Sequence, residues 1–129
     1  PNDMFVWINH DALLLLHDES LALHGGSGGM RDVGLFESAL YRPENLAVYG
    51  TPDVFACAAA YAYGLTKNHP FVDGNKRVAF LACGLFLYLN GYRLTASQVE
   101  ATLTMLALAA GELGESAFAD WLRQHTVSI

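Results

Sequence analysis

Nine consecutive residues near the middle of the chain, His69 to Arg77 (HPFVDGNKR), bring together a possible proton acceptor, a carboxylate and two cations. Histidine ordinarily has a pKa of about 6.5, so a neutral imidazole at position 69 can take a proton from a hydroxyl near neutral pH. Asp73 can hold a Mg²⁺ ion that bridges phosphate oxygens, since Mg²⁺ usually takes only one or two protein carboxylates. The combination predicts an active site for phosphate chemistry.

The second half of this stretch is typical of an anion site at the start of a helix. A helix that begins near Asn75 leaves the N–H groups of its first turn without partners inside the helix. Gly74 lets the backbone turn sharply and keeps side-chain bulk away from a ligand. Lys76 and Arg77 lie where basic residues are unfavourable by about 0.3–1 kcal/mol each, which suggests a bound anion. Asn75 is expected to position the loop or to contact a phosphate.

Positive charge gathers around this stretch in an otherwise acidic chain. The net charge is −6, yet Lys67, Lys76 and Arg77 fall within eleven residues. General nucleic-acid binding needs a basic face, so we exclude it. The pattern favours a small anionic ligand over a polymer, and Lys67 is expected to add a further phosphate contact.

Helical patterns cover most of the chain and place the nine residues on a bend between two helices. We expect a helix capped by Asn9 that runs to about Leu23, and a short one capped by Asp32 that runs to about Tyr41 and ends at Pro43. Further helices are expected from Asp53 to Lys67 after Pro52, from Asn75 to Leu89, from a cap at Ser97 or Thr95 to Ala110, and from Ser116 to Gln124. Residues 44–51 are expected to form a connection with one helical turn, and residues 92–94 a short extended piece. The glycine-rich residues 25–30 predict a mobile flap, a close backbone approach or a plain linker. The expected fold is all-α, a single domain of about six helices over residues 1–129, with at most a small hairpin.

Composition bounds the class of protein. The chain has 129 residues and 53% hydrophobic content, enough for one compact core. Its apolar runs are shorter than the roughly 20 residues needed to cross a bilayer, and no basic flank precedes them, so a cytoplasmic protein without membrane contact is expected. Cys57 and Cys83 lie in apolar helical patterns, which favours buried free thiols. Residues 1–4 are expected to be a disordered or tag-derived N-terminus, with Met4 as the natural start.

The nine residues resemble the signature of the Fic/Doc family, HxFx(D/N)(G/A)N(G/K)R, with every fixed position filled. Other stretches are similar to the death-on-curing branch of that family: LHD at 16–18, GG at 25–26, GMRD at 29–32, LFESA at 35–39, RP at 42–43 and FLYLNGY at 86–92. The resemblance implies a Fic/Doc-type helical bundle with the signature on a loop between two central helices. It also implies that His69 is the general base and that Asp73 serves Mg²⁺. Asn75, Lys76 and Arg77 would hold the nucleotide phosphates.

Two positions separate the branches of this family. The adenylylating branch usually has Gly at the position of Lys76 and a second Arg at the position of Phe80. The branch with Lys resembles toxins that transfer the γ-phosphate of ATP to a hydroxyl of translation elongation factor Tu. The resemblance therefore implies a phosphotransferase toxin that uses ATP and Mg²⁺ and arrests translation. Adenylyl transfer and a non-catalytic family member that binds only an antitoxin or a nucleotide are the alternatives.

Some members of the family carry an inhibitory helix with the pattern (S/T)xxxE(G/N). Here Glu44 is the one Glu that Gly or Asn follows, and Leu40 stands four residues before it. Inhibition is therefore expected from a second chain, a cognate antitoxin whose disordered segment folds on the toxin surface.

A row of histidines suggests a rival class of enzyme. His10, His17 and His24, with Asp11 and Asp18, have the composition of a metal-dependent hydrolase of the histidine–aspartate kind. Residues seven apart lie about 10.5 Å apart along a helix, so these histidines cannot share one metal. A surface or structural row is favoured.

Overall fold

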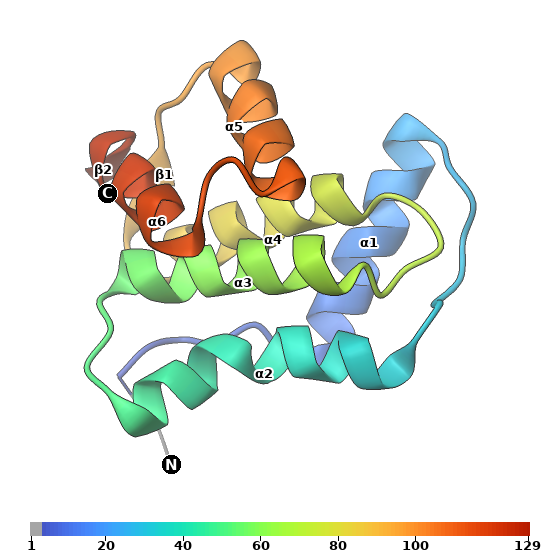
Figure 1. Cartoon of the computed structure of the whole chain (residues 1–129), viewed down its shortest axis with the longest axis horizontal. Helices are drawn as coiled ribbons and strands as arrows, with labels where there is room; N and C mark the ends of the chain where they lie inside the picture. The colour runs from blue at the N-terminus through green and yellow to red at the C-terminus, as the bar shows by residue number, and fades with distance from the viewer. Residues whose placement is uncertain (1–3) are drawn as a thin grey trace.

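The computed structural model describes residues 4–129, and helices form most of it (Figure 1). The described helices are α1 (His10–His24), α2 (Val33–Tyr49), α3 (Val54–Asn68), α4 (Asn75–Leu89), α5 (Gln98–Ala110) and α6 (Glu115–Gln124). Strands β1 (Tyr92–Leu94) and β2 (Thr126–Ser128) pair antiparallel. The predicted all-α fold is confirmed, with this small sheet added. The proposed remnant at residues 1–4 falls, except for Met4, outside the described residues.

Helices α3 and α4 pack against each other in the middle of the bundle, with α2 against α3 and α1 against α4 (Figure 1). Small side chains let α2 and α3 approach closely. A Cβ added at Gly64 of α3 would lie 3.2 Å from the Cα of Ala39 on α2. Cys57 and Cys83 are buried free thiols, as predicted, and burial raises the pKa of both. The bend between α3 and α4 is thus anchored at both ends in the core.

Helix α2 is longer than the sequence predicts. The expected end at Pro43 and the connection over residues 44–51 are wrong, because the helix continues through Pro43 to Tyr49. Proline inside a helix removes a hydrogen bond and typically costs about 3 kcal/mol. Here Pro43 is buried, and Arg42 beside it donates to Glu115 of α6 at 3.2 Å. Packing between helices that are distant in sequence therefore outweighs the local preference.

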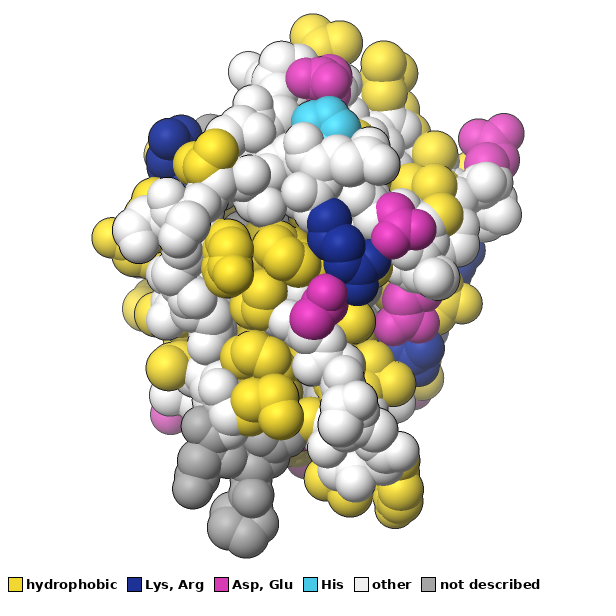
Figure 2. All heavy atoms as spheres, turned by 90° about the vertical axis from the view of Figure 1, so that its left-hand side faces the viewer, with side chains coloured by type: hydrophobic (Ala, Val, Ile, Leu, Met, Phe, Trp, Pro, Cys, Tyr) yellow, Lys and Arg dark blue, Asp and Glu magenta, His cyan; other side chains and the backbone are white. Residues whose placement is uncertain are grey.

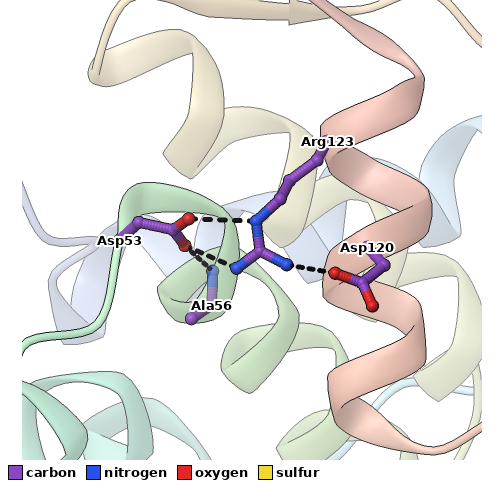
Figure 3. Close-up of polar contacts among 4 residues, drawn as sticks. All are labelled: Asp53, Ala56, Asp120 and Arg123. Carbon is purple, nitrogen blue, oxygen red and sulfur yellow. Dashed lines mark hydrogen bonds and ion pairs between the residues drawn. The ribbon is translucent and has the colours of Figure 1, made fainter.

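Helix α6 is tied to the start of α3 by a cluster of polar contacts (Figure 3). Asp53 was predicted as the first helical residue but is the N-cap of α3, and its Oδ1 accepts the N–H of Ala56 at 2.8 Å. Arg123 donates to both oxygens of Asp53 at 3.0 Å and to Asp120 at 2.6 Å. Burial alone would raise the pKa of Asp53, but the bonds from Arg123 and Ala56 outweigh it, and the pKa is lowered. The carboxylate is therefore ionised while it caps the helix.

The C-terminal strand closes the end of the bundle opposite the α3–α4 bend (Figure 1). Ser97 caps α5, as predicted, through a reciprocal pair of bonds with Glu100. On the face that carries β2, exposed hydrophobic side chains lie among scattered charged ones (Figure 2). Over residues 4–129, no helix combines the length and apolar character that a membrane span requires.

Candidate active site

The nine signature residues span the end of α3, the connecting loop and the first turn of α4. His69 is the C-cap of α3 and Gly74 is the N-cap of α4. The side chains of His69, Asp73, Lys76 and Arg77 are exposed, which leaves them accessible to a ligand. The predicted site residues of the signature therefore lie together on one accessible turn.

His69 adopts an unusual backbone conformation. Its φ of 50° and ψ of 54° are left-handed, and it is the only non-glycine residue with positive φ among residues 4–129. Its N–H donates to the carbonyl of Leu65 at 3.2 Å, the last bond of α3, and the left-handed backbone then ends the helix. A non-glycine residue in this region is strained by about 1–2 kcal/mol, so the surrounding contacts must hold it there.

Asp73 accepts a backbone hydrogen bond on each carboxylate oxygen. The N–H of Ser27 donates to Oδ2 at 3.2 Å, and the N–H of Gly74 donates to Oδ1 at 2.8 Å. These two bonds, with smaller effects from the nearby charges of Arg77 and His17, lower the pKa of Asp73. The carboxylate is consequently ionised at neutral pH, and each oxygen keeps a lone pair for a further ligand.

The N-terminal end of α4 has the features of an anion site. Gly74 has φ 78° and ψ 18°, and no side chain caps the helix. The first bond at this end runs from the N–H of Val78 to the carbonyl of Gly74, so the N–H groups of residues 75–77 have no partner within the helix. The side chains of Lys76 and Arg77 add positive charge to the same end.

Asn75 shapes the loop with its side chain. It is buried, its Oδ1 accepts the N–H of Phe71 and its Nδ2 donates to the carbonyl of Phe71, both at 2.9 Å. The sequence left open whether Asn75 positions the loop or contacts a phosphate, and its side chain bonds the loop. Contact with a phosphate would come from its backbone N–H.

The glycine-rich segment between α1 and α2 runs along the signature loop (Figure 1). The N–H of Val72 donates to the carbonyl of Gly29 at 3.0 Å, and Met30 forms an isolated bridge with Phe71. A Cβ added at Gly26 would lie 2.8 Å from Oδ2 of Asp73. Of the three predictions for this segment, the structure supports the close approach of its backbone to the signature loop.

His17 of α1 is a site residue whose role the sequence did not identify. Its side chain is buried, and its ring stacks on Phe71 with centroids 3.7 Å apart. Its Nε2 lies 2.8 Å from the carbonyl oxygen of Asp73, and because a carbonyl only accepts, this nitrogen donates. The signal that could have identified this role was the LHD stretch at 16–18, which resembles the family. The seven-residue spacing of the histidines does not indicate a contact with Phe71 or Asp73.

The other two histidines do not join His17. The ring of His10 packs edge-on against Phe36, and His24 lies at the last turn of α1. Over residues 4–129, no three His, Cys, Asp or Glu side chains cluster in a way that could hold a metal ion together. His10 and His17 thus pack against core phenylalanines, and His17 lies in the interior instead of on the surface.

Lys67 is directed toward the end of α5. Its Nζ lies 5.9 Å from the ring centroid of Tyr63 and 3.6 Å from the position of a Cβ on Gly111. A cation at this end of α5 is favourable because the carbonyls there carry partial negative charge. The additional phosphate contact assigned to Lys67 stays a prediction.

A groove of about 590 Å³ separates α4 from α5 and begins at the signature. Lys76 and Arg77 lie along it, and Phe80, Leu81 and Met105 belong to its apolar lining. Phe80 therefore contributes a ring to this groove at the position where the adenylylating branch has its second Arg.

Comparison with known proteins agrees with this geometry. The model of the "Fic/DOC family" matches residues 7–87, which include α1, the glycine-rich segment and the signature. A protein named "Protein kinase doc" from Escherichia phage P1 is 36% identical over 118 residues, which cover 91% of this chain and 93% of that protein. A "Toxin Doc" from Mycolicibacterium smegmatis is 44% identical over 75 residues, 56% of this chain and 57% of that protein.

Proposed function

Because the chain belongs to the Fic/DOC family, we propose that it is an enzyme that transfers the γ-phosphate of ATP to a hydroxyl side chain of a protein. One observation carries this proposal: the exposed His69 and the uncapped, positively charged start of α4 belong to one short turn. Such a turn can hold a phosphate and place a proton acceptor beside it.

In the proposed reaction, the neutral imidazole of His69 takes the proton of the acceptor hydroxyl. The hydroxyl oxygen forms a bond to the γ-phosphorus, the bond from that phosphorus to the bridging oxygen breaks, and ADP leaves with the electron pair. The N–H groups at the start of α4, with Lys76 and Arg77, neutralise the charge on the phosphoryl oxygens. The ordered loop holds these groups before the substrate arrives, which favours catalysis by positioning.

Asp73 fits the role of a Mg²⁺ ligand. Its carboxylate is exposed and ionised, and both oxygens keep a free lone pair beside their backbone bonds. Mg²⁺ sites commonly take one or two carboxylates and complete the shell with water and substrate phosphates. When bound, Mg²⁺ would supply positive charge to the phosphate oxygens.

Two observations favour phosphoryl transfer over the alternative, transfer of AMP. Lys76 stands where the adenylylating branch usually has Gly, a residue that leaves room for an α-phosphate. Phe80 lines an apolar groove where that branch has a cation. The name of the phage relative, "Protein kinase doc", points the same way.

We further propose that the protein is the toxin of a toxin–antitoxin module and acts in the cytoplasm. The name of the mycobacterial relative, "Toxin Doc", supports the first part. The proposed acceptor is elongation factor Tu, whose modification would arrest translation. The proposed inhibitor is a cognate antitoxin, and a segment of it that lay in the groove between α4 and α5 would cover Lys76 and Arg77.

The test follows the label of two forms of ATP. Purified protein is incubated with Mg²⁺ and elongation factor Tu, with ATP labelled at the γ position or at the α position. We expect the acceptor to gain label from γ-labelled ATP only, and His69→Ala to abolish this gain. Arg93→Ala removes an exposed cation on β1 and serves as the matched control.

Other outcomes separate the alternatives. Label transferred from α-labelled ATP would establish adenylylation in place of phosphorylation. If neither label moves, and wild type and His69→Ala are equally harmless when expressed in cells, the non-catalytic reading is correct.

A further inference from the structure

We propose that Arg31, which lies outside the signature, is a positioning residue that holds His69 in its left-handed conformation. This proposal rests on the transfer reaction proposed above. Arg31 follows the glycine-rich segment directly, just before α2, and its side chain reaches across to the end of α3.

The guanidinium of Arg31 bridges two successive carbonyls at the end of α3. Its Nε donates to the carbonyl of His69 at 2.8 Å, and its Nη2 donates to the carbonyl of Asn68 at 2.9 Å. Carbonyls at the end of a helix receive no hydrogen bond from an N–H group within the helix and carry partial negative charge. A planar guanidinium with donors at fixed spacing matches two neighbouring carbonyls, which a single ammonium cannot do.

His69 needs such support for two independent reasons. Its positive φ is unfavourable for any residue with a Cβ. The residue before a proline is also driven toward extended conformations, and Pro70 follows directly. A relaxation of His69 to negative φ would move its carbonyl away from Arg31 and change the direction in which its imidazole points.

Arg31 is itself held in place by its backbone. Its N–H donates to the carbonyl of Pro70 at 2.7 Å, and the N–H of Asp32 donates to the same carbonyl at 3.1 Å. On the other side, Nδ2 of Asn68 donates to the carbonyl of Leu35 at 3.0 Å. The side chain of Arg31 is thus aimed at the end of α3 by the contact between the start of α2 and the signature loop.

The first experiment measures transfer kinetics in Arg31→Ala, with Arg93→Ala as the matched control for lost charge. We expect kcat to fall by about tenfold or more, because misplacement of a reacting group has an effect of this size, while the KM for ATP stays within about twofold. Millimolar guanidinium should restore part of the rate to Arg31→Ala and none to His69→Ala. Arg31→Lys, which keeps the charge and loses the paired donors, should fall between Arg31→Ala and wild type.

Two kinetic results would overturn the proposal. If the KM for ATP rises and kcat stays constant, Arg31 contacts the nucleotide instead of the loop. If kcat falls no further than in Arg93→Ala, Arg31 is an ordinary surface residue.

The second experiment needs no transfer activity, so it decides the role of Arg31 even if the proposed function fails. The three-bond coupling between the amide and α protons of His69 depends on its φ. Loss of Arg31 should change this coupling and should speed hydrogen exchange of the His69 amide, which the carbonyl of Leu65 now protects. The amide of Cys57, at the other end of α3, should exchange as in wild type. An unchanged coupling in Arg31→Ala would refute the proposal that Arg31 holds His69 in its left-handed conformation, whatever happens to kcat.

Discussion

The contact between the glycine-rich segment and Asp73 makes a sharp prediction for Gly26→Ala. Gly26 has φ of 120°, and an added Cβ would lie 2.8 Å from Oδ2 of Asp73 and 3.0 Å from Cδ2 of Leu21. Carbon atoms do not approach this closely, so Asp73 or the segment must move and the bond from Ser27 must lengthen. Gly25→Ala is the matched control, because Gly25 has φ of 80° and an added Cβ would meet no atom within 4 Å.

The two variants should share one effect and differ in another. Each should lose about 1–3 kcal/mol of unfolding free energy from backbone strain alone, measured by urea denaturation. Only Gly26→Ala should also disturb Asp73. The bond from Ser27 is the largest influence that lowers the pKa of Asp73, so this pKa should rise in Gly26→Ala and stay at its wild-type value in Gly25→Ala. NMR titration of the Asp73 carboxyl carbon measures it. Equal pKa values in the two variants would refute the reasoning.

Two further predictions concern stability. Gly64→Ala should lower the free energy of unfolding by about 1 kcal/mol in urea denaturation, because the clash of the added methyl with the backbone of α2 costs more than the roughly 1 kcal/mol gained in helix propensity. Gly84→Ala, with only ordinary contacts nearby, should raise the free energy of unfolding by about 0.5–1 kcal/mol. A more stable Gly64→Ala variant would contradict the close packing of α2 on α3. Arg123→Ala should lose about 0.5–1 kcal/mol at pH 7, since the pair with Asp53 is partly exposed. The folded-state pKa of Asp53 is lowered, so this stabilisation is present above its unfolded pKa of about 3.9 and is lost as the pH falls through the folded value. Denaturation at a series of pH values should therefore show wild type and Arg123→Ala converging in acid, and a constant difference would contradict the assignment.

The parts of the fold that local signals specify could be predicted from the sequence. Helix α4 has the predicted bounds because Gly74 starts it and the Asn90–Gly91 pair ends it through their local backbone preferences. The continuation of α2 past Pro43 could not be predicted, since the ion pair beside it joins residues 73 positions apart. Strand β2 was missed for the same reason: no turn connects it to β1, and three residues carry no pattern of their own.

The site divides in the same way. The signature identified the side chains proposed to do the chemistry, because their types and order lie within nine residues. The residues that hold the loop, His17 and Arg31, act through the carbonyls of Asp73 and His69. Every residue has a backbone carbonyl, so the sequence does not indicate which carbonyl a given side chain will bind, and spacing alone could not identify these partners.

The hydrogen bonds that hold the signature loop also bear on when the site can form. They join residues that are 56, 46 and 38 positions apart: His17 with Asp73, Ser27 with Asp73, and Arg31 with His69. A growing chain cannot make any of them until the signature itself has been synthesised, although α1 and α2 precede it. Local opening of α1 in the finished protein would likewise release the loop. The site should therefore appear and disappear together with the packing of the bundle, and a partly folded chain should have no active turn.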